Sequence, residues 1–127
     1  MYVELTQGIE VEVRPEYIPT ESSPEDYRYV FAYHVTITNN GDTEVQLLSR
    51  HWIITDGAGV VHEVKGPGVV GETPKLAPGQ AHKYSSFCPL TTPTGNMRGT
   101  FQMVNKAGAS FDAKIPLFFL LDTRMMN

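Results

Sequence analysis

The sequence predicts an all-β domain, a two-sheet antiparallel sandwich of about seven strands with a fibronectin type III or immunoglobulin-like arrangement. Two observations carry this prediction. Apolar and polar residues alternate along most of the chain, whereas an amphipathic helix would repeat its apolar residues every three or four positions. Nine prolines and eleven glycines also interrupt the 127 residues too often for a long helix. A small barrel is the alternative fold.

Alternation is clearest in residues 29–38, which we take as a strand that ends at a tight turn, Asn-Asn-Gly-Asp. One face of this strand is expected to carry Tyr29, Phe31, Tyr33, Val35 and Ile37. Similar turns separate the other expected strands, which occupy residues 10–14, 44–55, 60–64, 80–87, 97–104 and 110–120. A sandwich is the usual arrangement for short strands at this spacing.

We expect residues 1–127 to form a single domain. Segment 15–26 contains three prolines, several acidic residues and few apolar ones, so we predict a mobile loop there. Residues 122–127 are predicted to be a frayed end.

The net charge of −4 argues against a protein that binds nucleic acid through its phosphates. Seven acidic side chains and one basic side chain lie in residues 1–26, which we interpret as a solvated strand edge; steering of a basic partner is the alternative. No apolar run is long enough to predict membrane insertion. Cys88 is the only cysteine, so an internal disulfide is excluded and a cytoplasmic location is expected.

Three glycines, Gly66, Gly68 and Gly71, have the spacing G-x-G-x-x-G of dinucleotide-binding loops. That motif works where a helix follows the loop, because the N-terminus of the helix meets the pyrophosphate. Here residues 72–80 contain two prolines, and Pro67 removes one amide from the loop itself. We therefore interpret the glycines as the bends of a loop between strands.

Weak binding of a nucleotide or pyrophosphate through loop 66–71 remains the alternative function. Successive glycine amides can form an anion-binding concavity without a helix. Lys65 and Lys75 flank the loop and would supply positive charge, together with His62.

No pattern of catalytic or metal-ligating residues emerges, so we predict no enzyme activity, no catalytic residue, no cofactor and no metal site. The four histidines lack metal-ligand spacing. Asp56, Glu63 and Glu72 offer oxygen ligands for a hard cation, but their spacing does not select them. The sequence identifies no general base that would activate Cys88, so we interpret it as a small buried side chain. The methionines at 97 and 103 are expected in the core.

Residues 50–52, Arg-His-Trp, form the most distinctive stretch. Alternation places Trp52 with Ile54 on one face, opposite His51 and Ile53, and a lone tryptophan on a central strand is typically a core anchor.

Two stretches together, SRHWIITDGAGVVHEVKGPGVVGETPKLAPGQ at 49–80 and YSSFCPLTTPTGNMRGTFQM at 84–103, resemble the bacterial ApaG family. The resemblance extends from about Ile9 to Phe118. It implies a fibronectin type III-like sandwich and links the chain to cobalt resistance and magnesium efflux. It also implies a protein-interaction role, since related domains accompany other modules in eukaryotic proteins. The positions that carry the family signature are Arg50, His51, Trp52, Asp56, Gly57, Gly66, Pro67, Gly68, Gly71, Pro78, Gly79, Cys88, Pro89 and Gly95.

From these observations we predict a non-catalytic module that binds a protein partner whose identity the sequence does not give. The expected interaction surface comprises Arg50, His51, Trp52, Gly66, Pro67, Gly68 and Gly71. The oligomeric state is left open, because exposed edge strands can pair.

Overall fold

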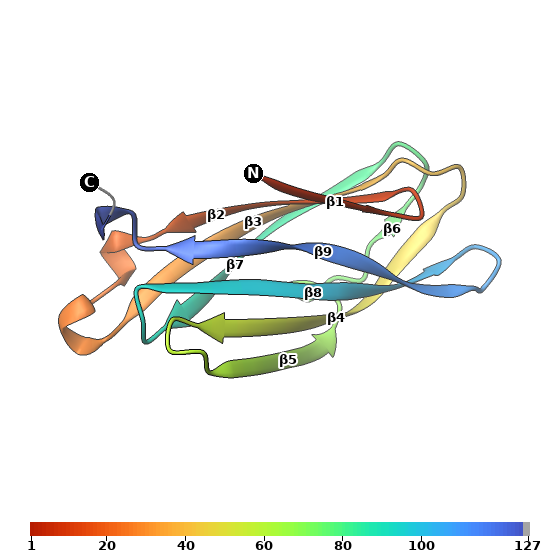
Figure 1. Ribbon diagram of the computed structural model, residues 1–127. Coiled ribbons are helices and arrows are strands. Elements are labelled where there is room, and N and C mark those ends of the chain that lie inside the picture. Colours follow the sequence, from red (N-terminus) through yellow and green to blue (C-terminus); the bar gives the residue numbers. More distant parts are fainter. Residues whose placement is uncertain (126–127) are drawn as a thin grey trace.

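A computed structural model describes residues 1–125, which form two antiparallel sheets packed face to face (Figure 1). One sheet has the order β1-β2-β3-β7; the other has the order β5-β4-β8-β9, with β6 also paired to β4. The strands are β1 (Tyr2–Thr6), β2 (Ile9–Tyr17), β3 (Tyr29–Asn39), β4 (Val45–Asp56), β5 (Val61–Pro67), β6 (Lys75–Leu76), β7 (Ala81–Leu90), β8 (Thr94–Asn105) and β9 (Ser110–Leu121). The predicted two-sheet sandwich is confirmed, a fibronectin type III-like arrangement is consistent with it, and the barrel alternative is wrong.

Two strands were not expected from the sequence. Strand β1 escapes the pattern because its apolar residues Val3 and Leu5 point to solvent, at 50% and 63% exposure, so its alternation does not mark the core. Strand β6 has only two residues, too few for any period. Apolar alternation finds a strand only where one face is buried.

Segment 15–26 is partly built into the first sheet. Strand β2 continues to Tyr17, which is buried, and Pro15 pairs with Tyr33 in the ladder to β3. The remainder forms two short 3-10 turns, η1 (Pro19–Glu21) and η2 (Pro24–Asp26). Residues 15–17 therefore belong to the sheet, and the mobility expected of segment 15–26 stays a prediction.

The chain end is held against the first sheet. Asp122 is buried, and its carboxylate accepts hydrogen bonds from Arg124 Nε (3.2 Å) and Nη2 (3.1 Å). Arg124 Nη2 also donates to the Tyr17 hydroxyl (2.8 Å), and the guanidinium lies over the Tyr17 ring. Arg124 lies within the turn η3 (Thr123–Met125), and the frayed end expected at residues 122–127 stays a prediction. Residues 126–127 lie outside the described part of the chain.

The core lies between the sheets and contains the face of β3 predicted from its alternation. Of the five residues expected on that face, all but Tyr29 are buried. Trp52 is 2% exposed and meets the rings of Phe101 and Phe118 edge to face. The methionines at 97 and 103 are buried as predicted.

A β-bulge in β4 decides which side chains of that strand face inward. The register to β8 shifts between Leu47 and Ser49, one residue before Arg50. Because of this shift, Arg50 shares the inner face with Leu47 and Trp52, although plain alternation from Leu47 would turn it outward.

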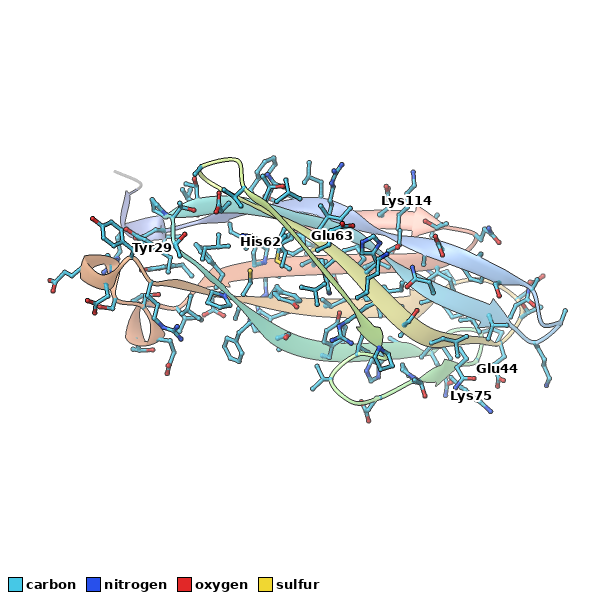
Figure 2. All side chains as sticks on the ribbon, turned by 90° about the horizontal axis from the view of Figure 1, so that it is seen from below. Tyr29, Glu44, His62, Glu63, Lys75 and Lys114 are labelled. Atoms are coloured by element: carbon cyan, nitrogen blue, oxygen red, sulfur yellow. The ribbon has the colours of Figure 1, made fainter. Side chains whose placement is uncertain are left out.

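The two flanks of the sandwich differ. On one, hereafter the closed flank, β9 packs against β1 and β2, and the Lys114 amide donates to Thr6 Oγ1 (3.1 Å). On the other, the open flank, edge strand β7 faces β4 and β5 without comparable packing. Figure 2 looks at the molecule from below, the side on which β5 lies in Figure 1. Within residues 1–125, no helix is long and apolar enough to cross a membrane.

Candidate functional site

The glycine-rich loop is built around the side chain of Arg50. Gly66 pairs with Arg50 in the ladder between β4 and β5, and a Cβ on Gly66 would lie 2.9 Å from Arg50 Nη1. The missing side chain therefore makes room for the guanidinium. From there Arg50 Nη1 donates to the carbonyl oxygens of Pro67 (2.9 Å) and Gly68 (3.0 Å).

The other two glycines permit the turn that follows. Gly68 (φ +61°) and Gly71 (φ +79°) adopt left-handed backbone angles, and a Cβ on Gly68 would clash with the Glu72 carbonyl oxygen. Between them Val69 is fully buried, so the loop inserts one apolar side chain between the sheets. The G-x-G-x-x-G spacing here satisfies three separate steric needs of one loop.

The loop offers few free amides to an anion. The Gly68 amide donates to Leu48 O (2.8 Å), and Val69 and Glu72 exchange backbone hydrogen bonds of 2.8 and 3.0 Å. What the loop presents toward Arg50 is a pair of carbonyl oxygens, which repel phosphate. This geometry does not favour the anion-binding interpretation of Gly66, Gly68 and Gly71.

The two lysines proposed to flank that anion site lie apart. Lys65 pairs with His51 on the outer face, whereas Lys75 pairs with Gln46. Five residues of β4 separate these positions, or roughly 17 Å at the rise of an extended strand. Figure 2 shows Lys75 well away from His62, the third residue of that hypothesis.

The acidic residues considered for a metal site also do not converge. Asp56 Oδ1 accepts from the amides of Ala58 and Val60 and so shapes the turn after β4. Glu63 Oε1 lies 2.7 Å from His51 Nε2, and Glu72 Oε2 lies 3.5 Å from His82 Nε2 on β7. Among the described residues, no three His, Cys, Asp or Glu side chains are grouped as metal ligands.

Of the predicted interaction surface, Trp52 is buried and forms no part of the free exterior. His51 is on the outer face of the second sheet, and Arg50 is half-buried on the inner face. Residues 50–52 therefore do not form one continuous exposed surface.

A cleft of about 520 Å³ occupies the open flank, a size typical of ligand sites. One wall comes from β4 and β5, the other from β7, and the floor is made by core side chains. Its lining residues are Arg50, Trp52, Ile54, Asp56, His62, Val64, Ser86, Phe87, Cys88, Pro89, Leu90, Thr91, Tyr33 and Met97. Sequence reasoning missed this cleft, because it depends on which strands the topology leaves unpaired.

Arg50 and Asp56 are the charged side chains that line the cleft, together with His62. Among the described residues, no carboxylate lies within ion-pair distance of the Arg50 guanidinium. Burial raises the pKa of Tyr33 and of Tyr84, and the positive charge of Arg50 opposes both shifts. Within the described part of the chain, the buried Tyr84 hydroxyl has no hydrogen-bond partner. Arg50 therefore places an uncompensated positive charge beside a partly desolvated, polar region of the interior.

Cys88 on the cleft wall is not an activated nucleophile. It is 4% exposed, and burial raises the pKa of its thiol to about 11. The thiol is therefore protonated at neutral pH, in agreement with its interpretation as a buried small side chain.

A nucleophile does lie beside a base on the outer face of the first sheet, which the sequence did not indicate. His34 Nδ1 is 2.6 Å from Ser85 Oγ, and His34 Nε2 is 2.9 Å from Glu16 Oε1. The three residues come from neighbouring strands β7, β3 and β2. Only the strand register brings them together, so no spacing in the sequence could have signalled this row.

A family model described as the ApaG domain matches residues 19–105. The chain is 55% identical over 119 residues to "Protein ApaG" of Aromatoleum aromaticum, covering 94% of each chain. It is also 55% identical to "Protein ApaG" of Mesorhizobium japonicum over 120 residues, 94% of this chain and 92% of that one. The crystal structure of a putative ApaA protein from Bordetella pertussis superposes with a TM-score of 0.90 at 50% identity, covering 92% of this chain and 95% of that one.

Proposed function

The chain belongs to the ApaG family, and from this premise we propose that it is a non-catalytic module that binds another protein along its open flank. The observation that carries the proposal is the solvent exposure of strand β5. This edge strand is exposed at every residue except Gly66, and the cleft lies beside it. Exposed edge strands and end loops are the common recognition elements of sandwiches.

The apolar rim of the open flank supports a protein partner. Val64 is 41% exposed and Phe87 is 62% exposed, and both line the cleft. A partner segment laid along β5 would cover these side chains and complete the unpaired edge of the second sheet. We place this module in the cytoplasm as part of the same proposal, and we assign the family's link to cobalt resistance and magnesium efflux to the partner.

The Ser85–His34–Glu16 row does not lead us to propose hydrolysis. Ser85 is exposed, and the side chains of His34 and Glu16 are 30% and 50% exposed. Acyl transfer relies on a water-excluded site with donors for the oxyanion. A pocket of about 400 Å³ does lie beside Ser85 and His34, but the three side chains of the row are accessible to solvent.

Photo-crosslinking in the host cell tests the proposed surface. A benzoylphenylalanine replaces Val64 on β5, and a matched variant carries it in place of Asp112, an exposed residue on the outer side of β9. We expect a discrete heteromeric adduct from position 64 and none from position 112. Adducts of equal yield at both positions, or an adduct at 112 alone, would contradict the proposal.

A further inference from the structure

Strand β7 has an unusual inner face. Its outer positions include Lys83, Ser85 and Phe87, whereas the residues that alternate with them, which point between the sheets, are His82, Tyr84, Ser86, Cys88 and Leu90. An inner face of a sandwich strand normally carries apolar side chains. Tyr84 packs against Phe101 of the opposite sheet and Cys88 and Leu90 belong to the core, so Ser86 is the polar side chain that this face turns into the cleft.

Across the cleft, Arg50 is already oriented. The carbonyl oxygens of Pro67 and Gly68 hold Nη1, and Gly66 leaves space for the guanidinium plane. These neutral acceptors fix the geometry without cancelling the charge. A planar guanidinium with donors to spare is the side chain best matched to a carboxylate.

The rest of the cleft is largely apolar. Trp52 and Leu90 form part of its interior, while Ile54, Val64 and Phe87 lie nearer its mouth. The ligand that satisfies both features has one carboxylate for Arg50 and an apolar body for the walls. A nucleotide fits poorly, because a phosphate chain would add several charges against a single cation.

We infer that the cleft between β4–β5 and β7 binds an acidic side chain of an apolar, extended partner segment, with the carboxylate on Arg50. This inference rests on the proposed function and names the chemistry of the partner. The segment would run beside β5, the edge strand of the second sheet that helps to line the cleft.

The test uses three probes on the purified chain: the peptide Ac-Leu-Val-Glu-Leu-Val-amide, its Glu→Gln counterpart and 4-methylpentanoate. Binding is followed by calorimetry and by the fluorescence of Trp52, the single tryptophan, which lines the cleft. We expect the Glu peptide to bind at least about tenfold more tightly than the Gln peptide, since a charge-assisted bond is lost in the latter. Equal affinity of the two peptides, or no saturable signal, would overturn the inference.

Matched variants separate the cleft from general electrostatics. Arg50→Gln and Lys65→Gln each remove one positive charge, but Lys65 lies on the outer face of β5. We expect only Arg50→Gln to abolish the preference for the Glu peptide. Because Arg50 also supports the loop, a second pair avoids it: Val64→Asp places a repelling charge at the cleft, and Val61→Asp places the same charge on the outer face. An equal loss from both aspartates would contradict the assigned position.

The probes also separate the sources of the carboxylate. Tighter binding of 4-methylpentanoate than of the Glu peptide would identify a free small acid and overturn the assignment to a partner segment. A crosslink from position 64 that survives Arg50→Gln at full yield would overturn this inference while leaving the proposed function intact. If the variant with benzoylphenylalanine at position 64 and an unchanged Arg50 gave no crosslink, the result would instead count against the proposed protein-binding function.

Discussion

The closed and open flanks of the sandwich differ in how they cover the space between the two sheets. On the closed flank the Tyr2 ring packs against Phe118 (6.2 Å between centroids) and Phe119 (6.5 Å), so that β1 and β9 seal the core. On the open flank, Ser86 of β7 and Arg50 of β4 place polar side chains at the cleft. The difference indicates that stability is concentrated on one flank and recognition on the other.

The glycine-rich loop contributes both to stability and to recognition. Val69 closes part of the open flank by entering the core, and the carbonyls beside it hold Arg50 at the cleft that remains. The glycine motif resembles a nucleotide site in the sequence, but in the structure it positions the side chain of Arg50. The distinction is visible only once the direction of the amides and carbonyls is known.

The sharpest contrast between the flanks is expected from two phenylalanines. Phe118→Ala should destabilise the protein by about 3–5 kcal/mol, because a fully buried ring is replaced by a cavity. Phe87→Ala, at the rim of the cleft, should change stability by about 0.5 kcal/mol or less. Chemical denaturation followed by Trp52 fluorescence measures both. Comparable losses would show that the open flank is as important to the core as the closed one.

Within the loop, Gly68→Ala should cost more stability than Gly71→Ala. Both residues have positive φ, which costs a side-chain-bearing residue about 1–2 kcal/mol. Only at position 68 does the new Cβ also meet the Glu72 carbonyl, whereas nothing lies within 4 Å at position 71. Thermal melts of the two variants give the comparison. Equal melting temperatures would show that the loop relaxes freely and does not fix Arg50.

A pH-dependent contribution is expected where the chain end meets β2. The hydrogen bonds from Arg124 hold the pKa of Asp122 below its ordinary value of 3.8, against the opposing effect of burial. Because the folded-state pKa is depressed, this stabilisation is present above pH 4 and is lost as the pH falls through the folded value. Asp122→Asn should therefore lower stability at pH 6 and should cost progressively less as the pH falls below 4. A difference that is constant with pH would contradict this account.

The smallest effect is expected from the outer face of the first sheet. Ser85→Ala should leave stability within about 0.5 kcal/mol and should not change the hydrolysis of p-nitrophenyl acetate, because the row with His34 and Glu16 is exposed. Esterase activity that disappears in this variant would show that the row is catalytic after all.

Sequence reasoning reached the core and missed the site for a common physical reason. Burial of one face is a period-two property, so alternation identified β3 and the inward position of Trp52. Alternation from Trp52 also places Arg50 on the inner face, but the residue pattern does not show the cleft that Arg50 lines. The cleft and the Ser85 row both arise from neighbours across strands, and that information is absent from the linear order.

Amide NMR mapping shows whether recognition belongs to the open flank. The spectrum of the uniformly ¹⁵N-labelled protein is recorded while the Glu peptide is added, with sodium pyrophosphate as a separate titrant. We expect saturable shifts along β5, the inner positions of β7 and the Trp52 indole, with β1 and β9 unmoved and no saturable response to pyrophosphate. Shifts centred on β1 and β9, or pyrophosphate shifts at Gly66, Gly68 and Gly71, would contradict this expectation.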